Sequence, residues 1–438
     1  MTPEVRVINI RVLQGDDAAA FRRSLSKRGR VAPETAGIES KVGTIIEMIR
    51  KDGDNALKEL SSLYGDPEWT SAKLSAEVIA SLIALVSPEN KQVIETAASR
   101  IRAFAEAIAG SMAPVRLDYG EFEVGIDYRP VKRIACYVPA GRYPLPSTAL
   151  MTAITARVAG VEEICIICPD LKPEIVFAGS LAGVGEFYQA GGAQAVAAAA
   201  LGTDSIKPVD MIVGPGNAFV TEAKRQLQGV VGIDMLAGPS EICAIADDGV
   251  DPDWAALDLL SQAEHAPDAL AYLLTPSASL AAAVSEALSR KVRELGLPDY
   301  IEESLEKSAI VVLDSLEQCC RVASEVAPEH LLLLVESPDD LLPELDNYGA
   351  LFKGYGSTVA FGDYMAGPNH TLPTGQTARF QGCLSPLTFL RPQSLVSVSR
   401  SAPRLAGETA AFASIEGLVA HKEAAAARLN EVLIIYPE

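Results

Sequence analysis

The chain has 438 residues, of which 49% are apolar and 21% are charged, and its 37 basic and 57 acidic side chains give a net charge of -20. Because binding to a phosphate backbone needs a basic face, this charge argues against a protein that binds nucleic acid irrespective of sequence. At roughly 150 residues per domain, the length predicts about two or three domains with an ample core. No apolar run approaches the roughly 18 residues that a membrane helix requires, so we expect a soluble protein without a membrane partner.

The N-terminus and the cysteines both indicate a cytoplasmic protein. The first twenty residues interleave charges with a few aliphatic residues and lack the apolar core of a secretion signal. Seven Cys fit a reducing compartment better than a disulfide framework. Cys165 and Cys168 form a C-x-x-C pair, but strand alternation would put them on opposite faces, and no second pair completes a zinc site. We therefore favour buried thiols over a metal site.

The pattern of elements predicts an α/β fold. The first 130 residues have helical period and few strand-like runs, which predicts a helical flank. From about residue 130, short β-branched runs alternate with helical stretches, the pattern of parallel sheets, and two sheets are plausible. The expected strands are 133–139, 162–168, 209–214, 241–247, 269–276, 309–314, 330–336 and 350–354. The expected helices are 147–160 with caps Ser147 and Thr148, the Ala-rich stretch after Gly191, 218–229, 253–266 started by Asp251 and Pro252, 278–295, and one long terminal helix over 408–433.

The chain has four His, and each lies beside polar or carboxylate residues in a segment that is otherwise apolar or small. Gln262 and His265 are three apart on a predicted helix, so both side chains project from one face, a common way to offer two ligands to one metal. Glu329 and His330 directly precede a buried strand, and a strand end usually meets a cleft. Taken singly, each His is more often a structural residue.

The other two His lie in the C-terminal part of the chain. Asp363 and His370 lie in a loop punctuated by Gly and Pro, which resists a purely packing explanation. Glu416 and His421 are five apart, roughly 140° of rotation on a continuous helix, so simple geometry prevents both from binding one ion. Two His, one Asp and one Gln form a set of oxygen and nitrogen donors suited to zinc or another divalent transition ion.

Loops after strands form the second group of candidates. The segment VGPGNAF follows a strand and opens a helix, which would aim backbone N–H groups at a phosphate or carboxylate. It lacks the G-x-G-x-x-G fingerprint, so tight turns that need Gly remain an equal interpretation. The segment CYVPAGRYPLPST follows another strand, and Ser240 and Glu241 stand where a third strand begins. Strand-to-helix loops of parallel sheets are where such folds bind ligands.

With these segments assembled, the chain resembles the histidinol dehydrogenase family over nearly its whole length, from about residue 30. All four His fall on functional positions of that family. The matching segments are YVPAGRYPLPSTALM, GGAQAVAA, VDMIVGPGNAFVTEAKRQ, GIDMLAGPSE, DLLSQAEH, APEHL, GDYMAGPNHTLPT, TARF and EGLVAH.

The resemblance implies a zinc-dependent, NAD-linked oxidation of an alcohol through an aldehyde to a carboxylate, which in the histidinol branch serves histidine biosynthesis. This agrees with general chemistry, because a neutral imidazole is well matched to deprotonate an alcohol, zinc does no redox work, and the hydride chemistry belongs to the nicotinamide. By resemblance, the zinc ligands are Gln262, His265, Asp363 and His421; the general base is His330 and the water-activating residue is Glu329; the substrate is held by Ser240, His370 and Glu416; and the dinucleotide meets Tyr137, Gln194 and Asn217.

The resemblance also implies the architecture. Two incomplete Rossmann-like parallel-sheet domains are expected, with helical N-terminal and C-terminal extensions, in a domain-swapped homodimer with shared sites. In that arrangement Glu416 and His421 reach the site of a partner chain. The expected divisions are 1–29 for the N-terminal extension, 30–136 plus 240–385 for a domain with the metal and substrate site, 137–239 for the NAD side, and 386–438 for the C-terminal helical domain.

Two other functions remain in view. The family includes sulfopropanediol dehydrogenases, and GRYP, NYGALF and NHTLPT read like that branch, whereas GPSE, TARF and EGLVAH fit the histidinol enzymes. We favour histidinol, with a sulfonated diol as the alternative. A basic side chain in place of Glu416 or His370 would have favoured an anionic substrate, and neither position has one. A metal-stabilised binding protein without catalysis is the other rival, and the adjacent Glu329 and His330 argue against it.

Overall fold

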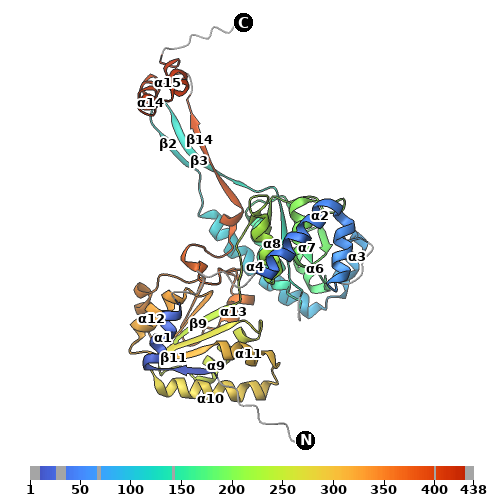
Figure 1. Ribbon diagram of the computed structural model, residues 1–438, viewed down its shortest axis with the longest axis vertical. Helices are drawn as coiled ribbons and strands as arrows, with labels where there is room; N and C mark the ends of the chain where they lie inside the picture. The colour runs from blue at the N-terminus through green and yellow to red at the C-terminus, as the bar shows by residue number, and fades with distance from the viewer. Residues whose placement is uncertain (1–9, 26–35, 67–70, 141–143, 399–400, 430–438) are drawn as a thin grey trace.

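The computed structural model describes residues 10–25, 36–66, 71–140, 144–398 and 401–429. The chain forms two neighbouring α/β layers, each a parallel β-sheet with its covering helices, and an antiparallel arm projects away from them (Figure 1). None of the described helices is both long and apolar enough to cross a membrane.

The first layer is a five-stranded parallel sheet in the order β6-β5-β4-β7-β8. Because β4 comes first in the chain yet lies between β5 and β7, the strand order reverses between β4 and β7. Helices α4, α5 and α6 supply the core on one face, and α2, α7 and α8 supply it on the other. The strands are β4 (Arg133–Tyr137), β5 (Glu163–Cys168), β6 (Glu186–Gln189), β7 (Met211–Val213) and β8 (Gly232–Ile233). The helices are α2 (Ala36–Leu63), α3 (Ala76–Leu85), α4 (Pro88–Gly110), α5 (Pro146–Val158), α6 (Pro173–Leu181), α7 (Gly192–Leu201) and α8 (Ala218–Leu227).

The second layer is a six-stranded parallel sheet in the order β1-β11-β10-β9-β12-β13, whose strand order reverses between β9 and β12. Helices α9, α10 and α11 cover one face, and α1 and α12 cover the other. The strands are β1 (Arg11–Leu13), β9 (Glu241–Ala246), β10 (Leu270–Thr275), β11 (Ala309–Val312), β12 (His330–Leu334) and β13 (Ala350–Lys353). The helices are α1 (Gly15–Leu25), α9 (Pro252–Ala263), α10 (Ala278–Leu295), α11 (Tyr300–Lys307), α12 (Leu316–Val326) and α13 (Val359–Tyr364), with short 3₁₀ turns η1 (Pro338–Glu344), η2 (Thr377–Arg379) and η3 (Pro386–Phe389).

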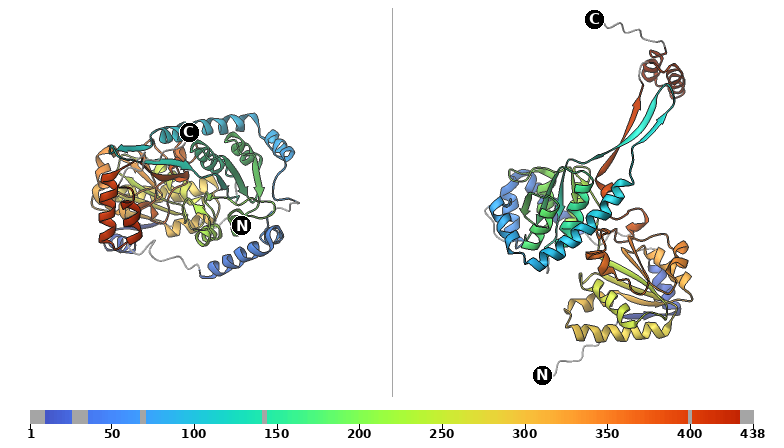
Figure 2. Two further views of the ribbon diagram at one scale, coloured as in Figure 1. Left: turned by 90° about the horizontal axis from the view of Figure 1, so that it is seen from above. Right: turned by 180° about the vertical axis from the view of Figure 1, so that it is seen from behind.

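The arm is a three-stranded antiparallel sheet that carries the last two helices of the chain. Its strands are β2 (Val115–Asp118), β3 (Glu123–Pro130) and β14 (Leu390–Ser397), and its helices are α14 (Pro403–Ile415) and α15 (Val419–Ala426). The right-hand view in Figure 2 shows the two helices at the far end of the arm, remote from both parallel sheets. Large apolar side chains on these helices, among them Phe412, Ile415 and Val419, are exposed in the single chain.

The expected division of the chain is wrong in three respects. Residues 11–25, expected in an N-terminal extension, form β1 and α1 of the six-stranded sheet. Helices α2 to α4, expected in one domain with that sheet, pack instead on helices of the five-stranded sheet. The five-stranded sheet begins at Arg133 rather than at residue 137, because β4 is its central strand.

The expected strands and helices between residues 133 and 354 are present, although several end at other residues than expected, and further elements were missed or wrong. Strands β2, β3 and β14 were not expected, nor were α6 and β6. Helix α5 begins at Pro146, so Ser147 and Thr148 do not cap it. The long terminal helix is wrong, because Gly417, with φ of +74°, separates α14 from α15. Asp251 does cap α9, by accepting a hydrogen bond from Asp253 N.

The two Cys of the C-x-x-C pair are buried free thiols that face opposite sides of β5, as expected. Cys168 packs in the core beneath α4 to α6, and Cys165 packs in the core beneath α2, α7 and α8.

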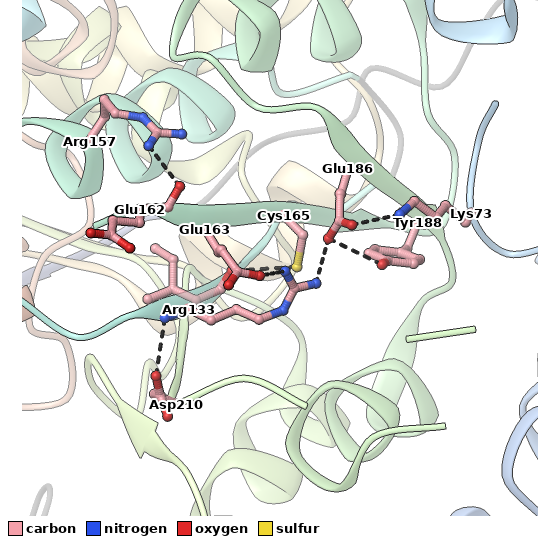
Figure 3. Close-up of polar contacts among 10 residues, drawn as sticks. Lys73, Arg133, Arg157, Glu162, Glu163, Cys165, Glu186, Tyr188 and Asp210 are labelled. Atoms are coloured by element: carbon pink, nitrogen blue, oxygen red, sulfur yellow. Dashed lines mark hydrogen bonds and ion pairs between the residues drawn. The ribbon is translucent and has the colours of Figure 1, made fainter. Parts of the chain in front are cut away.

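At the amino edge of the same sheet, Arg133 forms ion pairs with Glu163 on β5 and Glu186 on β6, and its backbone N–H donates to Asp210 (Figure 3). This guanidinium therefore fastens three neighbouring strands.

Candidate active site

Two glutamates and a histidine meet where β9 and β12 begin. Glu241 opens β9 and His330 opens β12, and the two strands pair in parallel. The Oε2 atom of Glu329 accepts a hydrogen bond of 2.9 Å from Glu241 N, and Nδ1 of His330 lies 3.2 Å from the Glu241 carbonyl oxygen. A carbonyl can only accept, so Nδ1 carries the ring proton and Nε2 keeps its lone pair. The backbone of β9 thus fixes the His330 tautomer.

Burial sets the protonation of this pair. Glu329 is 6% exposed and His330 is 4% exposed. Burial raises the pKa of Glu329 well above its ordinary value, although the hydrogen bond from Glu241 N opposes the change. Burial, together with the nearby His265 and His370, lowers the pKa of His330 to about 3, although the hydrogen bond with the Glu241 carbonyl opposes the change. The imidazole of His330 is therefore neutral at neutral pH.

Asp363 and His370 approach His330 from the loop side. Asp363 lies in α13, and its Oδ1 atom is 3.7 Å from Nε2 of His330. Burial raises the pKa of Asp363 to about 7. His370 donates from Nδ1 to the Asp363 carbonyl oxygen at 3.1 Å, and its Nε2 lies 3.4 Å from the hydroxyl of Thr148. Because Thr148 belongs to α5, the site lies between the two parallel layers.

Gln262 and His265 come from the end of α9. The helix ends at Ala263, so His265 lies just beyond it, where its backbone N–H donates to the Gln262 carbonyl at 3.2 Å. The expectation that both lie within one helix is therefore wrong. Gln262 is buried, and its Nε2 atom has no hydrogen-bond partner. Helix α9 contacts α13, which carries Asp363.

These donors do not make a complete metal site within one protomer. Among residues 10–429 apart from the undescribed gaps, no three His, Cys, Asp or Glu side chains cluster closely enough to hold an ion. Of the four residues expected to hold zinc, Gln262, His265 and Asp363 lie on or just after α9 and on α13, which contact each other, whereas His421 lies on α15. A further ligand would have to come from elsewhere.

Glu416 and His421 lie apart from the other site residues of the same chain. Both line one surface hollow between α14 and α15, together with Thr409, Phe412, Ala413 and Leu418. The argument from rotation on a continuous helix is wrong, because the chain breaks at Gly417 and both side chains reach the same hollow. This hollow lies at the end of the arm, away from the sheet that carries His330 (Figure 1).

The three residues expected to meet a dinucleotide gather at the carboxyl edge of the five-stranded sheet. Tyr137 ends β4, and its hydroxyl accepts a hydrogen bond of 3.0 Å from Gly192 N. Gln194 is buried in the first turn of α7. Asn217 caps α8 by accepting from two backbone N–H groups. Since β4 and β7 flank the reversal of strand order, this is the crevice where open parallel sheets bind ligands.

The six-stranded sheet departs from that rule. Its site residues, including the half-buried Ser240 just before β9, lie at the amino ends of the strands, contrary to the expectation of strand-to-helix loops. At the carboxyl edge, Asp247 accepts hydrogen bonds from the Tyr355 hydroxyl at 2.6 Å and from Glu336 N at 3.0 Å. Side chains of the protein itself therefore occupy the edge between β9 and β12.

Sequence reasoning missed two contacts of the site. Thr148 was expected as a helix cap and as the end of the candidate loop CYVPAGRYPLPST, but its contact with His370 was not expected. Asn369 was not singled out, yet it is 8% exposed and donates from its side chain to Met151 O and to Thr155 Oγ1. Its position directly before His370 was the only available signal.

The chain is similar to known proteins over most of its length. Residues 28–429 match the family model described as histidinol dehydrogenase. A histidinol dehydrogenase of Aquifex aeolicus (strain VF5) is 40% identical over 417 residues, covering 93% of this chain and 96% of that protein. One of Cereibacter sphaeroides is 42% identical over 413 residues, covering 92% and 95%. The crystal structure of histidinol dehydrogenase from Elizabethkingia anophelis has a TM-score of 0.90 at 32% identity, covering 96% and 98%. The chain therefore belongs to the histidinol dehydrogenase family and is an oxidoreductase of the NAD-dependent class.

Proposed function

We propose that this protein oxidises L-histidinol to L-histidine through the aldehyde, with zinc and NAD, in the cytoplasm as part of histidine biosynthesis. The observation that carries the proposal is the orientation of His330. Its Nδ1 donates to the Glu241 carbonyl, which leaves Nε2 as a proton acceptor beside Asp363. This is the arrangement that a general base for an alcohol requires.

The side chains of the pair have successive roles. His330 takes the alcohol proton at Nε2 while a hydride leaves the carbinol carbon. Glu329 then activates a water molecule for addition to the aldehyde, and His330 serves the second hydride loss. One alcohol, one water and two NAD molecules thereby give a carboxylate, two NADH and the released protons. When bound, NAD supplies the hydride acceptor.

The zinc ion would be held by three residues of one chain, Gln262, His265 and Asp363, together with His421 of the partner subunit. The buried Gln262 amide with an unpartnered nitrogen and the oxygen and nitrogen donor set are consistent with a borderline divalent ion. When bound, zinc would anchor and orient the substrate's amine and imidazole nitrogens. The rest of the substrate would be held by Ser240 and His370 of the same chain together with Glu416 of the partner subunit.

The nicotinamide dinucleotide would bind at the carboxyl edge of the five-stranded sheet, against Tyr137, Gln194 and Asn217. The reversal of strand order between β4 and β7 supports this assignment. The exposed apolar residues Phe412, Ile415 and Val419 at the end of the arm support a homodimer in which each arm covers the partner's site.

Two rivals have less support. A sulfonated diol would favour a basic side chain at the substrate positions, where the chain has Glu416 and His370. A binding protein without catalysis would not need a buried base such as His330, with a carboxylate adjacent to it and no metal-ligand role of its own.

Measuring NADH formed from L-histidinol against a panel of alcohols, including sulfopropanediol, tests the proposal. We expect L-histidinol to be the best substrate and to yield two molecules of NADH each. Turnover of the sulfonated diol with none of histidinol would instead support the other branch, and a yield of one NADH would contradict the double oxidation.

A further inference from the structure

A buried ion pair lies behind the loop that joins β7 to α8. Lys224 on α8 is 2% exposed, and the side chain of Asp234, just after β8, is fully buried. The two side chains form a direct ion pair. Neither has a role in the chemistry proposed above, so a charged pair at this depth needs another explanation.

The ion pair binds both backbone polar groups of Gly214, its carbonyl oxygen and its N–H group. Lys224 Nζ donates to the Gly214 carbonyl oxygen at 3.0 Å, and Gly214 N donates to Asp234 Oδ2 at 2.7 Å. Gly214 has φ of +109°, and a Cβ atom there would lie 2.2 Å from the Tyr137 carbonyl oxygen. The loop is therefore pressed against the end of β4 and clamped from behind by two charges.

This clamp lies three residues before Asn217. Only Pro215 and Gly216 separate Gly214 from the residue that caps α8, so fixing Gly214 fixes the start of the helix relative to Tyr137. Both lie at the crevice between β4 and β7. Lys224 and Asp234 would act only through the loop, as positioning residues.

The same pair fixes the chain where it leaves for the other sheet. Asp234 Oδ1 accepts from Met235 N at 2.7 Å, and Thr221 on α8 donates to the Ala237 carbonyl at 2.9 Å. The segment then enters β9 at Glu241, whose backbone holds His330 and Glu329. The position of the crevice and the start of β9 thus share one anchor.

We propose that the Lys224–Asp234 pair positions the Gly214–Asn217 loop for the dinucleotide, an inference that rests on the proposed NAD-dependent function. Replacing a buried ion pair by apolar or neutral residues of similar volume is often neutral for stability. Stability alone therefore does not account for the pair, whereas a clamp on both sides of Gly214 needs one donor and one acceptor in fixed positions.

The test separates folding from positioning with three variants. Lys224→Met leaves Asp234 as an unpaired buried charge, and Lys224→Met/Asp234→Asn removes that charge while still freeing the Gly214 carbonyl. Lys207→Met, at an exposed lysine near the opposite edge of the sheet, is the matched control. NADH binding is measured by fluorescence titration, with Tm, zinc content and the KM values for NAD and L-histidinol.

We expect the double variant to recover a Tm near that of the wild type while its Kd for NADH and its KM for NAD stay raised by about tenfold or more. Zinc content should not change, the KM for histidinol should rise less than the KM for NAD because Thr221 still holds the segment before β9, and the control should match the wild type throughout. A double variant with wild-type NADH affinity would overturn the inference alone. If the wild-type chain itself failed to bind NADH, the proposed function would be contradicted and this inference overturned with it.

Discussion

The side-chain amide of Asn369 donates a hydrogen bond of 2.8 Å to the backbone carbonyl of Met151, which joins the loop before His370 to helix α5 of the other layer. A second bond of 3.2 Å reaches Thr155 Oγ1 on the same helix, and Oδ1 of the Asn369 side chain accepts from Thr371 N. The position of His370 is thus set from the layer of the five-stranded sheet.

Replacing Asn369 by Ala should raise the KM for histidinol by about tenfold to a hundredfold, because a displacement of His370 by about 1 Å costs that much. The buried Met151 and Thr155 partners lose a hydrogen bond, so the free energy of unfolding should fall by about 1–3 kcal/mol. Steady-state kinetics and denaturant unfolding measure both. Thr155→Val is the control, since it leaves the bond to Met151; a normal KM in Asn369→Ala would exclude the positioning role.

His330→Asn should reduce turnover by about 10²- to 10⁴-fold, the usual contribution of a general base, while zinc content stays that of the wild type. Asparagine keeps a donor toward the Glu241 carbonyl but has no lone pair that accepts a proton at neutral pH. NADH production and metal analysis on the same sample give both values. Unchanged turnover would remove His330 from the role of base.

Asp363→Ala should lose both zinc and activity, in contrast to His330→Asn. The carboxylate is the only charged donor in the set of Gln262, His265, Asp363 and His421, and an anionic ligand contributes strongly to the binding of a divalent ion. Metal analysis after dialysis checks this. Full metal occupancy in the variant would exclude Asp363 as a ligand.

The sequence predicted the central elements well, because the two sheets are built from short buried β-branched runs with clear helices between them. It did not predict the arm. Strand β14 lacks the alternation of apolar and polar residues that marks a strand resting on a core, and β2 alternates over only four residues, too short a run to identify a strand; no residue of either strand is buried. It also missed the break at Gly417, since one glycine within an amphipathic stretch is compatible with a continuous helix.

The sequence predicted that some of the candidate residues lie together, but not where they lie or that Glu416 and His421 lie elsewhere in the same chain. His330, Asp363 and His370 are brought together as the four-histidine pattern suggested. The positions of His330 and Glu241 at the starts of strands were expected, but not that the site gathers at this amino edge, because local sequence does not say which edge of a sheet is free; Tyr355 and Asp247 occupy the other. Contacts between distant segments, such as Asn369 with Met151, have no signature in a single sequence.

Glu186 makes the stability of the five-stranded sheet sensitive to acid. Burial alone would raise its pKa, but hydrogen bonds and charges from Lys73 and Arg133 lower it to about 2 (Figure 3). Because the folded value lies below the ordinary 4.5, the stabilisation is complete above about pH 4.5 and is lost as the pH falls toward 2. Tyr188 and Cys165 also face this group, and both stay neutral in that range.

Glu186→Gln should therefore cost about 2 kcal/mol of unfolding free energy at pH 7, the value of a hydrogen bond to a charged group, and much less at pH 3. Urea unfolding at pH 7, 5 and 3 measures the difference. Glu163→Gln removes the other, half-exposed partner of Arg133 and should cost less than about 1 kcal/mol. An equal loss at all three pH values would show that the charge of Glu186 is not what stabilises the sheet.

The proposed sharing of active sites between two chains predicts that two inactive variants can restore each other. His330 lies in the six-stranded sheet and His421 lies at the end of the arm, so one chain cannot bring them together as it stands (Figure 1). In a dimer of one His330→Asn chain and one His421→Ala chain, one site would receive both changes and the other would receive neither. Hybrids isolated by two different affinity tags should then retain about half of the wild-type turnover per dimer, whereas each variant alone should be nearly inactive.

If every site used its own chain's His421, both sites of the hybrid would be damaged and no activity would return. Because His421 is exposed in the single chain, its replacement should also leave the Tm of the protomer unchanged, which separates a lost ligand from a lost fold.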